Sequence, residues 1–251
     1  METTKLYNGE VEISFDPDKH KYFWGDKEID GVTSVLKVIA KPQLIPWAVK
    51  KDLEYAHDTI LERQPESRED FDKIFEEAKG YHDRVKEGAG ERGTFVHKLI
   101  ERFAKGLDTD VEILDNFKFN LFRKFVEETN VSFKESERPV FSKKHLYCGT
   151  TDGIVEWNGK LYILDIKTNS IKPYRKTGIY LNYWLQTSAY QKAYEEETGV
   201  TINGRVIVRL GDDGIEVAVS RGRKPLRDDF SAFGGALSLH RRTIEYGANR
   251  G

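Results

Sequence analysis

The chain contains a single cysteine, Cys148, among its 251 residues. One cysteine excludes a disulfide within the chain, a four-cysteine zinc site and a four-cysteine iron–sulfur cluster. We interpret Cys148 as a small residue that packs beside a strand. The sequence also lacks any apolar run that approaches about 20 residues, so we expect no membrane-spanning helix and no membrane partner.

A large charge of either sign is absent as well, because the formal net charge is −2 at pH 7. A nucleic-acid partner would therefore have to be held by a local basic surface. The first residues have neither the apolar segment of a secretory signal nor the composition of a transit peptide, which favours a cytoplasmic protein. With 33% charged and 38% hydrophobic residues, the chain is expected to be soluble and folded.

Alternating segments in residues 10–31 predict a small antiparallel meander. Helical patterns follow as far as residue 129, and a Gly-rich stretch at residues 87–93 is expected to separate two of these helices. The expected helices cover residues 33–39, 47–63, 67–85, 93–104, 110–129, 179–197 and 226–246. The expected strands after the meander cover residues 132–141, 146–157, 160–167, 201–210 and 215–220.

This order of elements predicts an α/β (α+β) fold, with a central mixed β-sheet flanked by helices and a helical N-terminal half. We expect the meander and helical region in residues 1–90 to pack on a core formed by residues 91–251. In the helix at residues 47–63, a face with Trp47, Val49, Leu53 and Ile60 is expected to belong to the hydrophobic core.

The dipeptide Asn158–Gly159 lies between two apolar segments and is typical of a two-residue hairpin loop. If these two residues form the loop, Trp157 faces Lys160. Counting outward from that pair then places Asp152 opposite Asp165. The sequence therefore predicts two carboxylates on one face of a hairpin.

Like charges directly opposite each other destabilise a sheet, so this pair needs compensation. Lys167 lies two residues beyond Asp165, and the period of a strand returns it to the same face. Both faces of this strand are otherwise apolar, which predicts that it is covered on both sides. In such a place a carboxylate pair is costly unless it binds a cation or shares a proton.

Residues 149–155, Gly-Thr-Thr-Asp-Gly-Ile-Val, and residues 164–168, Leu-Asp-Ile-Lys-Thr, resemble the motifs of the PD-(D/E)XK nuclease superfamily. Within it they resemble the RecB-like exonuclease branch, here without an iron–sulfur cluster. The resemblance implies a restriction-endonuclease-like core in which Asp152, Asp165 and the backbone carbonyl of Ile166 bind one or two Mg²⁺ or Mn²⁺ ions. It also implies that Lys167 assists the attacking water.

Two flanking segments extend the resemblance. Gly93-Thr-Phe-Val-His97 is similar to an upstream helix of RecB-like nucleases, which implies that His97 completes the metal shell. Gln186-Thr-Ser-Ala-Tyr190 is similar to a downstream helix whose i,i+4 spacing puts both side chains on one face of the site, where Gln186 positions the water or the lysine. Glu137, on the strand before the hairpin, binds a second metal or faces solvent, and both alternatives stay open.

Basic and aromatic residues alternate after the hairpin, as they do in grooves that bind single-stranded nucleic acid. The candidates for nucleic-acid contact are Lys172, Arg175, Lys176, Tyr180, Tyr183 and Trp184. The alternative is a solvated loop followed by an ordinary packing face. A second basic segment at residues 221–224 is interpreted as surface, and five further histidines are interpreted as structural: His20, His57, His82, His145 and His240.

The sequence therefore predicts a divalent-metal-dependent nuclease that hydrolyses DNA phosphodiester bonds. The resemblance further implies an exonuclease that acts on single-stranded or duplex DNA ends in recombination, repair or replication. Two alternatives remain, a structure-specific endonuclease and a catalytically inert nucleic-acid-binding module on the same fold.

Overall fold

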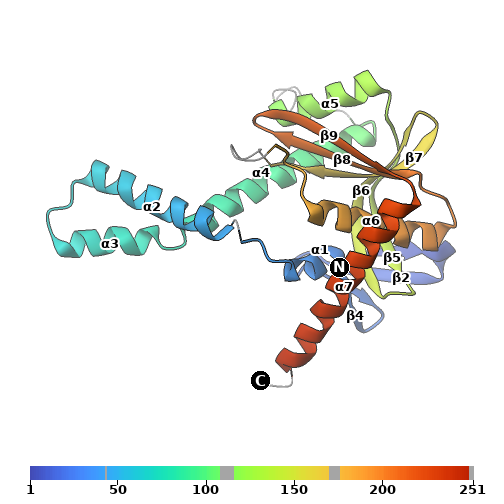
Figure 1. Cartoon of the computed structure of the whole chain (residues 1–251), viewed down its shortest axis with the longest axis horizontal. Coiled ribbons are helices and arrows are strands. Elements are labelled where there is room, and N and C mark those ends of the chain that lie inside the picture. The colour runs from blue at the N-terminus through green and yellow to red at the C-terminus, as the bar shows by residue number, and fades with distance from the viewer. Residues whose placement is uncertain (43, 108–115, 170–175, 249–251) are drawn as a thin grey trace. The chain divides into compact units, whose positions relative to one another are not determined.

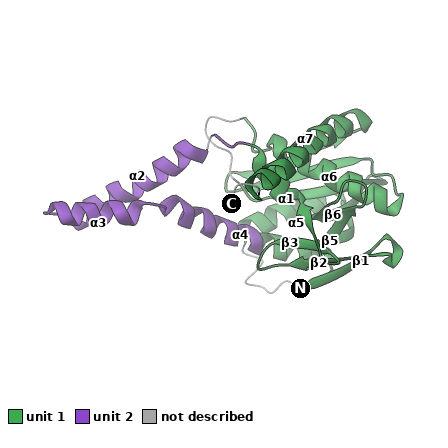
Figure 2. Cartoon of the chain, turned by 90° about the horizontal axis from the view of Figure 1, so that it is seen from below, with its two compact units in different colours: residues 1–39, 96–251 green, residues 40–95 purple. Residues whose placement is uncertain are grey.

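The computed structural model describes residues 1–42, 44–107, 116–169 and 176–248. Contacts divide the chain into two compact units, one formed by residues 1–39 with 96–251 and the other by residues 40–95 (Figure 2). The boundary expected at residue 90 falls inside helix α4 (Tyr81–Ala104). We expected residues 1–39 to belong with the helical region up to residue 90. They belong instead to the unit that contains the sheet.

In the described residues, nine strands of the first unit form one mixed sheet (Figure 1). Its order is β1-β2-β3-β4-β6-β7-β8-β9, and β5 pairs with β6. The pairs β4–β6 and β7–β8 are parallel and the others antiparallel, so the predicted mixed sheet is confirmed. The strands are β1 (Glu2–Leu6), β2 (Val11–Asp16), β3 (Lys21–Trp24), β4 (Lys27–Gly31), β5 (Ser132–Ser142), β6 (Tyr147–Trp157), β7 (Lys160–Lys167), β8 (Gly204–Gly211) and β9 (Gly214–Arg221).

Helices cover both faces of the sheet. On one face α6 (Leu181–Thr198), α7 (Arg223–Ala248), α1 (Val32–Val35) and the 3₁₀ turn η2 (Leu36–Val38) pack against Ile154 and Ile163. On the other face the last part of α4 and α5 (Phe117–Thr129) pack against Leu164 and Ile166. Strand β7 is therefore buried on both sides, as predicted. Residues 110–115 of the helix expected at 110–129 lie outside the described residues.

The N-terminal meander joins the central sheet through β4, where Asp30 pairs with Tyr147 and Gly31 with Cys148. Its strand β1 was not predicted, because only Leu6 of its five residues is buried and the hydrophobic alternation is weak. A short 3₁₀ turn, η1 (Tyr7–Gly9), connects β1 to β2. Cys148 is buried in the cluster between the meander and the sheet, which confirms its packing role.

The predicted helix break at residues 87–93 is wrong, because α4 runs without interruption through Gly88, Gly90 and Gly93. A glycine inside a helix costs about 1 kcal/mol, which neighbouring turns can offset. The break lies instead at Gly80, whose left-handed φ of +73° ends the segment after α3 (Arg68–Ala78). The positive φ, rather than the number of glycines, marks the turn.

In the second unit α2 (Leu44–Arg63) packs against α3 around Ala56, Ile74 and Ala78. The predicted core face of α2 is wrong at Val49 and Leu53, which are 53% and 60% exposed, whereas Ile60 packs against the buried cluster as predicted. The face that carries Ala56 is buried instead, because its small side chain lets the two helices approach. Among the described residues, no helix combines the length and the apolarity needed to cross a membrane.

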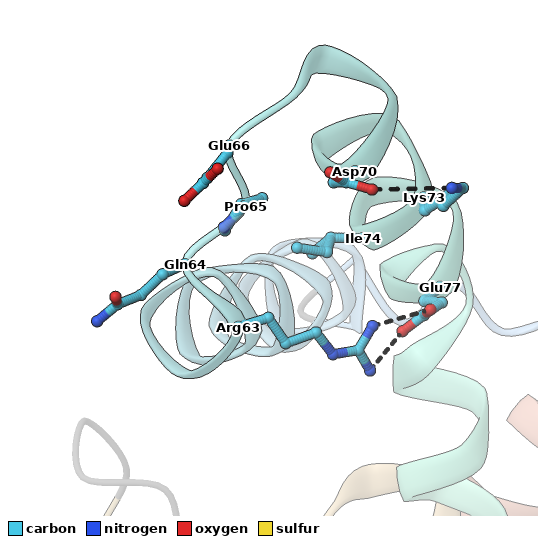
Figure 3. A pocket seen from close by; sticks show the side chains of 8 residues that line it. All are labelled: Arg63, Gln64, Pro65, Glu66, Asp70, Lys73, Ile74 and Glu77. Carbon is cyan, nitrogen blue, oxygen red and sulfur yellow. Dashed lines mark hydrogen bonds and ion pairs between the residues drawn. The ribbon is translucent and has the colours of Figure 1, made fainter.

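A hollow of about 480 Å³ lies where α2 ends and α3 begins (Figure 3). Figure 3 shows Arg63 of α2 reaching Glu77 of α3, with two nitrogen–oxygen pairs at 3.1 and 3.0 Å. Lys73 and Asp70 form a looser pair at 3.7 Å on α3. These pairs lie at the surface, where water screens them and they contribute little to folding.

Candidate active site

The candidate site lies where strands β6 and β7 separate. The hairpin pairing runs from Trp157↔Lys160 to Gly153↔Leu164, in the predicted register, and ends there. Strand β5 occupies the other edge of β6, so β4 and β7 share the remaining edge at residues 147–148 and 153–157. In the described part of the chain, residues 149–152 have no strand beside them on this edge, which leaves a fork in the sheet.

Asp152 spans this fork with its side chain. The predicted ladder pair between Asp152 and Asp165 does not form, because the strands have already diverged. Instead, Asp152 Oδ2 accepts a hydrogen bond from the backbone N–H of Ile166 at 2.5 Å, and Oδ1 lies 3.2 Å from His97 Nδ1. The N–H and C=O of a strand residue point to the same edge, so the Ile166 carbonyl faces the same gap.

Asp165 and Lys167 adjoin Asp152 in a cavity of about 570 Å³ that all three line. Lys167 Nζ is 2.9 Å from Asp165 Oδ1 and 3.1 Å from Gln186 Oε1. The second carboxylate oxygen, Asp165 Oδ2, is buried and has no hydrogen-bond partner among the described residues. An unsatisfied buried carboxylate oxygen is costly, and a bound cation would relieve that cost.

His97, Glu137 and Asp152 form a second group of ligand atoms, all within 4.8 Å of one another. They come from three elements, α4, β5 and β6. Glu137 lies between the β5–β6 pairs Ser136↔Gly153 and Arg138↔Thr151 and has an uncommon left-handed φ of +46°. Carboxylate oxygens suit Mg²⁺ and Mn²⁺, and an imidazole adds a nitrogen donor that transition metals accept.

Burial and charge shift the acids of this cavity in opposite directions. Burial raises the pKa of Glu137 to about 7, with a further contribution from the charge of Asp152. Burial also raises the pKa of Asp165 to about 6, although Lys167 opposes the shift. Burial acts on Asp152 in the same direction, but the charge of His97 and its hydrogen bond outweigh it and lower the pKa of Asp152. Burial therefore favours the neutral form of Glu137 and Asp165, whereas His97 favours the ionised form of Asp152.

Helix α6 holds Lys167 in place. Gln186 accepts from Lys167 through Oε1 and donates through Nε2 to the Tyr190 hydroxyl at 2.9 Å, so the expected i,i+4 pair lies on one face. Tyr190 is buried, and a Cβ added at Gly149 would lie 2.5 Å from its Cε1 atom. The glycine at position 149 therefore leaves room for the ring that orients Gln186.

The predicted basic contacts to nucleic acid are described only in part. Lys172 and Arg175 lie outside the described residues, and Lys176 is exposed. In the second basic segment, Arg223 pairs with Glu195 at 2.9 Å, as an ordinary surface residue does.

Two of the three aromatic residues predicted to contact nucleic acid, Tyr183 and Trp184, already face cations of the protein itself. The Tyr183 ring lies 5.1 Å from Lys167 Nζ, and Tyr180 meets Tyr183 edge-on at 5.4 Å. The guanidinium of Arg205 lies 5.7 Å from the Trp184 ring. Contact of these three rings with nucleic acid stays a prediction.

Sequence reasoning missed several residues that line the cavity. Glu101 follows His97 by four residues on α4, and this helical spacing could have identified it. His20, interpreted from the sequence as structural, also lines the cavity, as do Phe15 and Tyr22. No local motif marks the residues of the meander, because β4 brings them to the site only in the folded chain.

No protein-family model matches the chain, and no curated protein matches it. The solved structures that match include SSO0001, with 15% identity and a TM-score of 0.33 over 50% of this chain and 58% of that chain. They also include an alkaline exonuclease (LHK-Exo) from Laribacter hongkongensis, with 13% identity and a TM-score of 0.31 over 61% of this chain and 81% of that chain. The chain thus spans less than two thirds of the length of SSO0001. Similarity this low determines no function for this chain.

Proposed function

We propose that this chain is a divalent-metal-dependent nuclease that hydrolyses phosphodiester bonds of DNA, acting as an exonuclease on DNA ends. The observation that carries the proposal is the buried, unpartnered Oδ2 of Asp165 beside Lys167, in the cavity that also holds the cluster of His97, Glu137 and Asp152. The assignment to a restriction-endonuclease-like, RecB-like core, the preference for ends and a role in recombination, repair or replication rest on the motif resemblance alone.

The residues present fit a hard divalent cation. Asp165 Oδ2 is buried without a partner in the described chain, and three further donors, those of His97, Glu137 and Asp152, line the same cavity. Asp152, Asp165 and the Ile166 carbonyl would hold one Mg²⁺ or Mn²⁺, and His97 and Glu137 would complete its shell or hold a second ion. Such an ion, when bound, lowers the pKa of its water and offsets the charge of the phosphate.

The side chains of the cavity position the reacting groups. An ammonium group has three N–H donors, and Lys167 directs two of them to Asp165 and Gln186. The third is left for the attacking water or a phosphate oxygen. Gln186 fixes the direction of the lysine, and the buried Tyr190 hydroxyl fixes the orientation of the Gln186 amide.

The test is cleavage of end-labelled single-stranded, duplex and circular DNA with Mg²⁺ or Mn²⁺. We expect the linear substrates to be shortened from an end, the circle to survive, and Asp165→Ala and Lys167→Ala to be inactive. Cutting of the circle would indicate a structure-specific endonuclease instead. DNA binding without cleavage of any substrate would indicate an inert binding module, and variants as active as the parent would refute the assigned site.

A further inference from the structure

The cavity that contains the candidate metal ligands has a second wall, which the N-terminal meander supplies. Glu2, Phe15 and Tyr22 are directly paired across β1, β2 and β3, so their side chains lie on one face of the meander. All three line the cavity. The Tyr22 hydroxyl lies 3.5 Å from Thr150 Oγ1, inside the fork of the sheet, and ties this wall to β6.

The wall presents aromatic rings that belong to one cluster. The Phe15 ring lies 4.7 Å from that of Tyr22 and meets the His20 ring edge-on at 5.3 Å. Tyr22 is buried, Phe15 is partly buried and His20 is exposed, so Phe15 and His20 are the rings that a ligand in the cavity can reach. A planar ligand is the natural partner of such a surface.

The turn between β2 and β3 holds His20 in place. Asp16 Oδ1 accepts hydrogen bonds from the backbone N–H groups of Asp18 and Lys19, both at 3.1 Å. His20 follows in a left-handed conformation, with φ of +53°, which non-glycine residues seldom adopt. The turn is therefore organised before any ligand arrives, and ordering it costs little on binding.

The charged residues that line the cavity limit which part of a nucleic acid the meander wall can bind. Among the described residues that line the cavity, Glu2, Glu101, Glu137, Asp152 and Asp165 carry carboxylates, whereas Lys167 is the one lysine and no arginine is present. Such a lining gives a phosphate backbone little direct attraction apart from a bound metal. Stacking of a base on an aromatic ring does not depend on that charge, because every base has a π-face.

We propose that Phe15 and His20 form a nucleobase-binding subsite, which receives the base of the nucleotide beside the phosphate to be cut. The inference rests on the proposed nuclease function and deepens it, because it assigns the meander a part in substrate binding. The subsite recognises a base by stacking, so it accepts any of the four bases.

The test is a binding measurement that does not depend on cleavage. In the Lys167→Ala protein with Mn²⁺, we titrate oligonucleotides that carry 2-aminopurine at the 5′ or the 3′ terminal nucleotide and follow its fluorescence. We expect stacking to quench one of the two probes. An oligonucleotide with an abasic residue at that terminus should bind about 5- to 150-fold more weakly than one with a base.

Three variants locate the effect. Phe15→Leu keeps an apolar side chain but removes the ring, and His20→Asn keeps a residue that tolerates a left-handed φ. Both variants should reduce the quenching. Both should also reduce the difference in affinity between oligonucleotides that end in a base and those that end in an abasic residue. Phe23→Leu is the matched control, because Phe23 follows Tyr22 in β3 and points to the opposite face of the meander. It should behave as the parent does.

The outcomes separate this subsite from the function on which it rests. If the protein binds the oligonucleotides but quenches neither probe and ignores the abasic residue, the subsite is refuted and the nuclease proposal stands. Equal quenching in the parent and in Phe15→Leu would also refute it. If no oligonucleotide binds, the nucleic-acid function fails, and the subsite fails with it.

Discussion

Charged side chains have opposite surroundings in the two compact units. In the first unit, Asp165 is 1% exposed and its pKa is raised to about 6, with one oxygen that lacks a partner among the described residues. In the second unit, Glu77 lies at the surface, and its hydrogen bond to Arg63 lowers its pKa. The hollows beside them have similar volumes, about 570 and 480 Å³.

This contrast shows that a hollow by itself says little about function. The hollow of the second unit is lined by charges that pair with each other in water, at little cost and little gain. The cavity of the first unit keeps acids at a cost to folding, and perturbed acids in a cleft are typical of functional sites. Four predictions test this difference, ordered from the largest expected effect to the smallest.

Removal of one lysine from each unit should have very different effects on catalysis. Lys167→Ala should lower the cleavage rate about 10³-fold, because we propose that Lys167 contacts the attacking water or the phosphate. Lys73→Ala removes a surface lysine paired with Asp70 and should change the rate less than about twofold. Initial rates on end-labelled DNA measure both. A similar loss in the two variants would remove the distinction between the two hollows.

Addition of one methyl group should destabilise the site and stabilise the helical unit. Gly149→Ala places a Cβ 2.5 Å from Tyr190 Cε1 and should lower the free energy of unfolding by about 1–3 kcal/mol. Gly90→Ala lies in α4 with nothing within 4 Å and should raise it by about 0.5–1 kcal/mol. Urea denaturation of both variants gives the comparison. A stabilised Gly149→Ala protein would show that Tyr190 does not require this glycine.

Neutralisation of Glu137 should stabilise the metal-free protein at high pH. Its pKa is raised from 4.5 to about 7, so the folded state binds the proton more tightly and stability falls as pH rises from 4.5 to 7. For this partly exposed group we expect Glu137→Gln to gain about 1–2 kcal/mol at pH 8 and nothing at pH 4. Denaturation in EDTA measures the gain. An equal gain at both pH values would contradict the electrostatic cause.

Neutralisation of Glu77 should have the opposite sign and the smallest effect. The hydrogen bond from Arg63 lowers the pKa of Glu77, so its contribution is present above the ordinary glutamate pKa and is lost as pH falls. Glu77→Gln should therefore lower the denaturation midpoint slightly at pH 7 and leave it unchanged at pH 3. The denaturation midpoints of Glu77→Gln and Glu137→Gln are compared with that of the parent. If the midpoint falls as far in Glu77→Gln as it rises in Glu137→Gln, surface acids and cavity acids do not differ as proposed.

Part of the site was predictable because its spacing is local. Asn158–Gly159 specifies the hairpin register through Gly153↔Leu164, and the i,i+4 spacing puts Gln186 and Tyr190 on one face of α6. The mixed sheet was predictable for a different reason, because the order of strands and helices along the chain limits the possible sheet topologies. The roles assigned to His97, Asp152, Asp165 and Lys167 stay predictions that the geometry accommodates.

Other features could not be predicted, because they depend on residues far apart in the chain. Gly88, Gly90 and Gly93 suggested a helix break that α4 does not make, and Val49 and Leu53 suggested a core face that is exposed. Gly88 and Gly90 have no left-handed φ, and a glycine ends a helix where its φ is positive, as at Gly80. No motif in residues 10–31 indicated that Phe15 and His20 would line the cavity.

The sequence alone determined the hairpin, the order of the strands and helices from β5 onward, and the chemical types of the candidate ligands, because all of these follow from neighbours a few residues apart. Only the tertiary structure decided that β4 and β7 pair with the same edge of β6, where Gly31 pairs with Cys148 and Gly153 with Leu164. That pairing opens the fork at residues 149–152. The fork turns Asp152 toward His97 and Ile166, because a strand edge without a partner leaves its polar groups to be satisfied by side chains.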